Sequence, residues 1–126
     1  MRRLTAVLEK LMEVLKSATG FHVNVGWNPS TTFPSITLQM RNCEITPLDL
    51  TSSKHLIDIS VQIDICHTSP KARDEISDKV IQHFEETRQQ LSEELDAYSI
   101  SFEAVFDVDD EKCFRKTMLL RLRMVG

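Results

Sequence analysis

Apolar and polar residues alternate without interruption in one segment of the chain, residues 57–65. Isoleucine or valine occupies positions 57, 59, 61, 63 and 65, and polar residues occupy the positions between them. Successive side chains of a strand point to opposite faces, so this segment predicts a strand with one apolar and one polar face. The polar face would carry Asp58, Ser60, Gln62 and Asp64.

Two further segments have the spacing of amphipathic helices. Leucine, valine and methionine recur every three or four residues ahead of Gly20, which predicts a helix over about residues 3–18 that packs on a sheet. Gly20 suits the end of that helix because glycine adopts a left-handed conformation at little cost. Ser69 and Pro70 suit a helix start, and the apolar positions after them predict a second helix from 70 to about 90.

Shorter alternating stretches predict four more strands, at residues 21–27, 36–40, 100–106 and 118–124. Residues 43–53 break the pattern and predict either an irregular loop or a hairpin extension beyond the sheet. The acidic residues 107–112 predict a turn. The resulting order is one helix, three strands, one helix and two strands.

This order predicts an α+β fold in which both helices pack on a mostly antiparallel, mixed sheet of about five strands. Only the passage from strand 57–65 through the second helix to strand 100–106 could be a crossover, and it would be right-handed if those strands are parallel. With 126 residues, we expect a single domain over positions 1–126.

Composition and charge narrow the function classes. The formal net charge of −4 argues against a nucleic-acid-binding protein, which needs a basic face. No run of 18 apolar residues occurs, so we expect no membrane partner. The three cysteines lack the CxxC spacing of zinc ribbons and thioredoxin-like sites, which favours reduced thiols.

No residue pattern supports catalysis or metal binding. Cys66 and His67 are neighbours whose side chains would point to opposite faces of a strand, which favours a buried cysteine and a strand-end histidine over a zinc site. Asp58 and Asp64 would lie about 20 Å apart along one strand, too far for an acid/base pair. The acidic turn lacks the glycine and final glutamate of a calcium loop. We expect no cofactor, no metal and no enzymatic activity.

Several side chains are candidates for protein–protein contact. Arg121 and Arg123 lie on the polar face of the last predicted strand, and they would meet Asp58 and Asp64 across the sheet or between subunits if the two strands are neighbours. Trp27, the only tryptophan, predicts either core packing or an interface anchor. The two segments between strands are candidate docking segments, with Leu48, Asp49 and Leu50 in one and Asp109, Asp110 and Glu111 in the other.

The layout as a whole resembles the tail terminator (tail completion) proteins of long-tailed bacteriophages and prophages. The resemblance covers nearly the whole chain: a helix ending near Gly20, a proline-led strand at 35–42, a variable loop, a long alternating strand that runs into Thr68, Ser69, Pro70 and a helix, and a final pair of strands. The family has no invariant catalytic motif, so no functional residue can be transferred to this chain.

The resemblance implies a homo-oligomeric ring, usually a hexamer, at the neck end of the virion tail. Such a ring ends the polymerisation of the tail tube protein, joins the tail to the head–tail connector and is assembled in the host cytoplasm. DNA would pass through its lumen without sequence-specific binding, and acidic residues on the polar strand face would keep DNA from adhering. The alternatives are another phage neck or tail-tube component, a secretion-system homologue and, less favoured, a small Cys/His metal-dependent enzyme.

Overall fold

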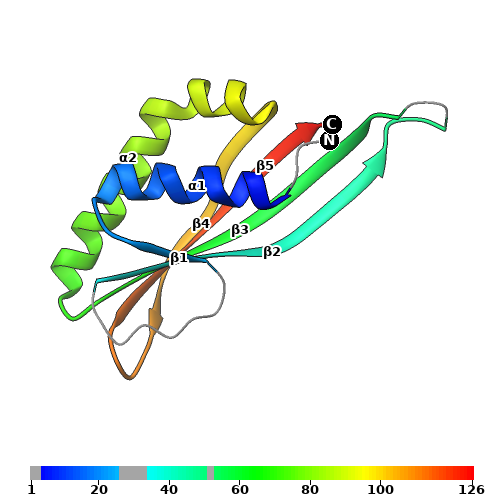
Figure 1. Cartoon of the computed structure of the whole chain (residues 1–126). Coiled ribbons are helices and arrows are strands. Elements are labelled where there is room, and N and C mark those ends of the chain that lie inside the picture. The colour runs from blue at the N-terminus through cyan, green and yellow to red at the C-terminus, as the bar shows by residue number, and fades with distance from the viewer. Residues whose placement is uncertain (1–3, 26–33, 51–52) are drawn as a thin grey trace.

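The computed structural model describes residues 4–25, 34–50 and 53–126. Within them, two helices lie on one side of a five-stranded sheet (Figure 1). This confirms the predicted α+β class and the order of elements. The elements are α1 (Leu4–Thr19), β1 (Val23–Val25), β2 (Ser35–Pro47), β3 (His55–His67), α2 (Pro70–Leu95), β4 (Ala97–Asp109) and β5 (Phe114–Val125).

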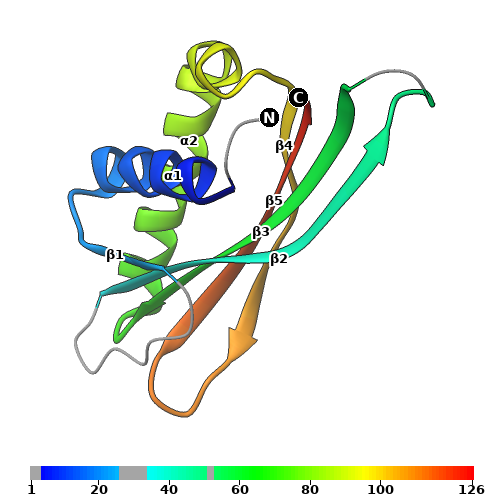
Figure 2. The same cartoon turned by 45° about the vertical axis from the view of Figure 1, so that its right-hand side comes forward.

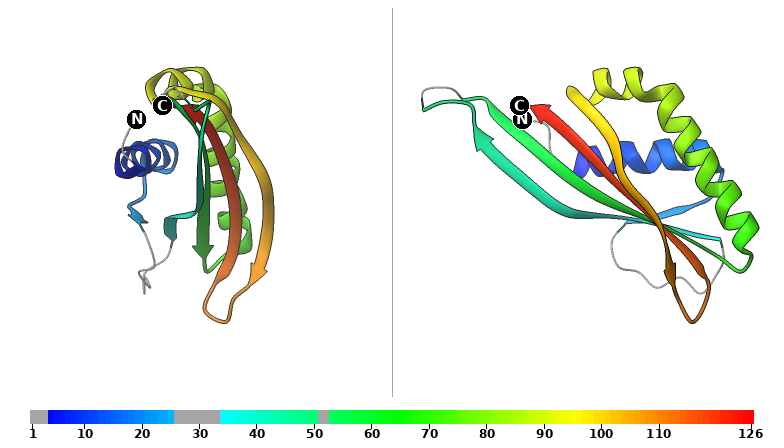
Figure 3. Two further views of the ribbon diagram at one scale, coloured as in Figure 1. Left: turned by 90° about the vertical axis from the view of Figure 1, so that its right-hand side faces the viewer. Right: turned by 180° about the vertical axis from the view of Figure 1, so that it is seen from behind.

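The strictly alternating strand, β3, lies at the centre of the sheet. The strand order is β1-β2-β3-β5-β4, and β3 pairs along its length with β2 on one side and β5 on the other. Only the short β1 is parallel to its neighbour, and the remaining pairs are antiparallel. Figure 3 (left) shows β2, β3, β5 and β4 side by side with α2 behind them. Because β3 and β4 run in the same direction, α2 is the predicted crossover.

The core fills the space between the helices and one face of the sheet. Ile59, Val61 and Ile63 of β3 are fully buried there, and alternate residues of β5 from Met118 to Met124 lie beside them. Each such side chain contributes about 1.5–3 kcal/mol when it leaves water. As predicted, the apolar stripe of α1 packs on the sheet. The helices contribute Val7, Leu11, Leu15, Ile76, Val80, Phe84, Leu91 and Leu95.

The helix ends follow the capping residues in the sequence. Gly20 has a φ of 76°, and its N–H donates to the carbonyl of Lys16 at 2.7 Å, which ends α1. Ser69 caps α2, because its Oγ accepts a hydrogen bond from the N–H of Ala72 at 3.3 Å. The predicted end of this helix near residue 90 was wrong. Leu91 and Leu95 continue the buried stripe, so α2 extends to Leu95.

The segment after residue 42 is a hairpin extension and not an irregular loop. β2 continues to Pro47, and its last five residues pair with the first residues of β3, ending with Pro47 opposite His55. We call residues 43–50 and 53–58 the arm. Figure 2 shows the β2–β3 hairpin projecting past both helices. The sheet is therefore longer than the layer of helices that covers it.

Two strand boundaries differ from the prediction. β4 includes Asp107 and Asp109, which were predicted to lie in a turn, because β5 continues opposite them and Lys116 forms an ion pair with Asp107 at 3.5 Å. The turn is therefore limited to residues 110–113. β1 is shorter than predicted, and Trp27 lies outside the described residues. No helix in the described part of the chain is long and apolar enough to cross a membrane.

Candidate functional site

The face of the sheet that points away from α1 and α2 is the candidate functional surface, and we call it the open face. The pairing of β3 with β5 places Asp58 opposite Arg123, Ser60 opposite Arg121, and Asp64 opposite Thr117. The two strands are therefore neighbours, which was the condition for their opposite charges to meet. All six residues predicted for this surface lie on it: Asp58, Ser60, Gln62, Asp64, Arg121 and Arg123.

Asp58 is the centre of an ion-paired network at the arm end of the open face. Arg121 donates two hydrogen bonds to its carboxylate, one of them from Nε at 2.9 Å, and Arg123 Nε lies 3.9 Å from it. Arg121 also contacts Glu103 at 3.2 Å. The hydrogen bonds from Arg121, followed by the two positive charges, hold the pKa of Asp58 below its usual value. The arginines are thus tied to carboxylates of this chain.

Asp64 belongs to a second and separate network. It is only 8% exposed, whereas the sequence predicted a solvated position. Thr117 Oγ1 donates to one carboxylate oxygen at 2.6 Å, and Gln62 Nε2 donates to the other at 2.7 Å. Neighbouring side chains on the open face can exclude water without any covering helix, and strand alternation alone does not reveal this. Asp58 and Asp64 have different partners, so they do not form a paired-carboxylate site.

The arm carries the first candidate docking segment and presents apolar side chains to solvent. Leu48 is 45% exposed, Leu50 is fully exposed, and Asp49 between them is also exposed. The structure adds Ile45 and Leu56, which are 46% and 38% exposed on the same hairpin. The sequence did not predict these two as exposed, and Ile45 lies in the segment without a clear pattern. Ile45 and Leu56 lie on opposite faces of the hairpin, so the arm exposes apolar side chains on both sides. Exposed apolar groups commonly mark a binding surface.

The second candidate docking segment is the turn between β4 and β5, and only part of it faces solvent. Asp110 is half-buried, where it forms an ion pair with Arg115 at 2.6 Å and accepts a hydrogen bond from the N–H of Lys112 at 2.9 Å. This carboxylate therefore organises the turn. Asp109 and Glu111 on either side are exposed and remain available for docking.

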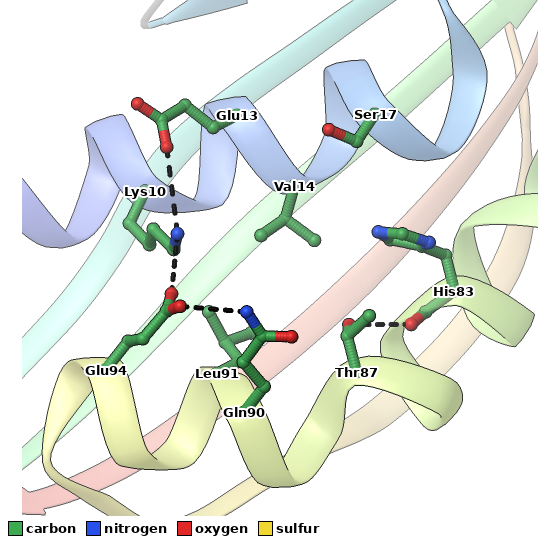
Figure 4. A pocket seen from close by; sticks show the side chains of 9 residues that line it. All are labelled: Lys10, Glu13, Val14, Ser17, His83, Thr87, Gln90, Leu91 and Glu94. Atoms are coloured by element: carbon green, nitrogen blue, oxygen red, sulfur yellow. Dashed lines mark hydrogen bonds and ion pairs between the residues drawn. The ribbon is translucent and has the colours of Figure 1, made fainter.

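Two hollows lie outside the open face. A groove of about 240 Å³ lies between α1 and α2, and an ion pair between Lys10 and Glu94 at 2.5 Å bridges it (Figure 4). Lys10 also pairs with Glu13 of its own helix at 3.8 Å. The hydrogen bond with Glu94 raises the pKa of Lys10. A second hollow, of about 480 Å³, lies beside the β4–β5 turn, and we call it the acidic cavity. Its lining includes Arg73, Asp107, Asp109, Asp110, Glu111 and Cys113.

The described residues contain no cluster of three or more His, Cys, Asp or Glu side chains that could hold a metal ion. Cys66 is buried, as predicted, and the His67 ring accepts a hydrogen bond at Nδ1 from the N–H of Ser69 at 3.0 Å. His67 therefore supports the start of α2.

No family model and no curated protein matches this sequence. Among solved structures, the fold is similar to that of a chain from the virion of a native gene transfer agent particle. The TM-score is 0.53, the sequence identity is 13%, and the likeness covers 98% of this chain and 95% of the other. At this identity the comparison shows a shared fold along almost the whole length of both chains.

Proposed function

We propose that this chain is a structural protein of a phage-like virion, and that within the virion it is the tail terminator. In this role it forms a ring, of six copies as in the family that it resembles, that ends polymerisation of the tail tube and joins the tail to the head-side connector. The observation that carries the proposal is the likeness to a virion chain over 98% of its length. The likeness therefore includes nearly all the helices and strands of this chain and is not limited to one motif.

The edges of the sheet support assembly into a ring. In the described structure β4, with 13 residues, has a neighbour on one side only, and β1 covers just three residues of β2. Unpaired strand edges are ready-made surfaces for association with another chain. The arm projects from the body (Figure 2), and its exposed leucines are suited to contact the tube or the connector.

The ion pairs of the open face suit a lumen through which DNA slides. Phosphate binding requires positive charges that are free to neutralise it. Arg121 and Arg123 are instead engaged by Asp58, and Arg121 also by Glu103. If the open face lines the lumen, this internal pairing makes the surface close to neutral toward DNA.

The lumen hypothesis can be tested with one substitution and a matched control. Asp58→Ala releases the arginines, so assembled rings should bind DNA more tightly in low-salt mobility-shift assays. Asp78→Ala removes the same charge from an exposed position on α2 and should leave binding unchanged. Equal DNA binding by the two variants would contradict a role for the open face in the lumen.

The terminator role itself is tested by deleting the gene and imaging the particles by electron microscopy. We expect overlong tubes without heads. Complementation with Leu50→Asp should fail if the arm docks on the tube or connector, whereas Gln89→Asp, at an exposed position of α2, should restore normal particles. Tails of normal length with heads attached in the deletion strain would refute the role. Tails of normal length without heads would instead indicate another neck component.

A further inference from the structure

Two cysteines from distant parts of the sequence lie close together where the end of β3 meets the β4–β5 turn. Cys66, near the end of β3, is opposite Arg115 in the ladder, and Cys113 precedes Arg115 by two residues. Residues in this relation are diagonal neighbours on one face of a sheet. Both cysteines are free, and the Cys66 thiol is near enough to contribute to the raised pKa of Cys113.

The local geometry is compatible with a covalent bond between these thiols. A disulfide needs the two Cβ atoms roughly 3.8 Å apart, closer than most diagonal neighbours. Cys113 lies in the turn and outside the β4–β5 ladder, so its backbone can make the remaining approach without breaking a strand pair. The third cysteine, Cys43, has no such opportunity, because it lies opposite Ile59 on the helix-facing side of the sheet.

The acidic cavity borders one of the two cysteines and offers a route by which a small oxidant could approach it. Cys113 lines the cavity and is half-buried, whereas Cys66 is only 8% exposed. Burial, followed by the hydrogen bond with Cys66, raises the pKa of Cys113 to about 12. The reactive thiolate is therefore scarce at neutral pH, and thiol–disulfide exchange at Cys113 should be slow. Carboxylates in the lining favour a reagent with positive charge.

The surroundings of Cys66 suit the second step of an exchange. Arg115 lies directly opposite Cys66 in the β3–β5 ladder, and its buried Nε has no hydrogen-bond partner among the described residues. A positive charge is therefore placed beside the sulfur that must attack once Cys113 has reacted.

We propose that Cys66 and Cys113 form a redox-active dithiol that closes to an intramolecular disulfide and fixes the 110–113 turn to the end of β3, with a small disulfide entering through the acidic cavity as the oxidant. Cys113 loses its proton to water and attacks the reagent, which forms a mixed disulfide and releases one thiol. Cys66 then loses its proton and attacks the sulfur of Cys113, and the second half of the reagent leaves as a thiol. In total the protein loses two protons and two electrons, and the reagent gains them as it becomes two thiols.

The biological timing of this step rests on the proposed function. A chain assembled in a reducing cytosol and then carried outside the cell in a virion passes into an oxidising environment. The dithiol would stay open during assembly and close in the released particle, where a fixed turn resists unfolding. The chemistry itself concerns the isolated chain and does not depend on the tail role.

The test exposes the purified folded chain to cystamine, a cationic disulfide, followed by alkylation, digestion without reductant and mass spectrometry. We expect a single cross-link between the peptides that carry Cys66 and Cys113, with Cys43 alkylated. Cys43→Ser should behave like the wild type. Cys113→Ser should form no intramolecular bond. The melting temperature of the oxidised wild type should rise by about 10 °C, because the bond closes a long loop.

Oxidised glutathione, which is anionic, tests the access route. It should react more slowly than cystamine at low salt, and the difference should shrink as salt screens the carboxylates. Equal rates at low salt would overturn the access route. Free Cys66 and Cys113 after prolonged exposure, with a urea-unfolded sample fully oxidised by the same reagent, would overturn the proposed disulfide. Cross-links to Cys43 or between chains would overturn it equally.

Discussion

Replacing Thr117 by valine tests whether the buried network around Asp64 stabilises the fold through its hydrogen bonds. Thr117 is 3% exposed, and its hydroxyl donates to the Asp64 carboxylate at 2.6 Å. Valine has nearly the same shape but no hydroxyl. The carboxylate, itself only 8% exposed, would keep Gln62 as a partner and lose the shorter of its two hydrogen bonds.

The expected loss follows from the type of bond removed. A hydrogen bond to a charged group contributes about 1.5–3 kcal/mol, and water cannot easily replace the donor at a buried site. We therefore expect Thr117→Val to lower the free energy of unfolding by about 2 kcal/mol. For a chain of this size, the melting temperature should fall by roughly 6–10 °C.

Thr117→Ser is the matched control because it keeps the hydroxyl and removes one methyl group. Its expected loss is about 0.8 kcal/mol, from the smaller buried apolar surface. Urea denaturation followed by circular dichroism measures both variants under the same conditions. If serine destabilises the chain more than valine does, packing and not hydrogen bonding dominates at this position, and the reasoning is refuted.

Three other substitutions test other parts of the fold. Ser69→Ala removes the cap of α2 and should cost about 1 kcal/mol of unfolding free energy in urea titrations, whereas Ser69→Asp should preserve most of it. Ile63→Ala opens a cavity at the centre of the sheet and should cost roughly 2–5 kcal/mol, measured in the same way. Asp58→Asn should destabilise the chain at neutral pH. The pKa of Asp58 is lowered in the folded chain, so the wild type should remain more stable than the variant down to about pH 4. This advantage in unfolding free energy should disappear as the pH falls through the folded pKa. A constant difference between the two chains in acid urea titrations would contradict the role of the ion pair.

Much of the fold could be predicted because local patterns and tertiary packing agree. Strict alternation in residues 57–65 reflects a strand with core on one side only, and β3 has that environment. Gly20 and Ser69 each form their capping hydrogen bond with a residue three or four positions away, so the sequence alone indicates both helix ends. The meeting of Asp58 with Arg121 was predicted only conditionally, because it required β3 and β5 to be neighbours.

The errors occur where distant contacts override local preference. Asp107 and Asp109 favour turns, yet they lie in β4 because Lys116 and Phe114 are opposite them in β5. The buried carboxylate of Asp64 accepts a hydrogen bond from a threonine 53 positions away. The same applies to the contact between Cys66 and Cys113, which only the pairing of β3 with β5 reveals. The single domain and the docking role of the arm stay predictions.

The position of β5 has a consequence for how the chain folds. β5 is the last of the described strands in the sequence, yet it lies between β3 and β4 in the sheet. While a ribosome is still synthesising the chain, β3 and β4 therefore have no strand between them, and the apolar face of β3 lacks the methionines and leucines of β5 beside it. Such non-local pairing slows folding and leaves strand edges open to other chains. We expect nascent chains that lack β5 to be the species most prone to aggregate.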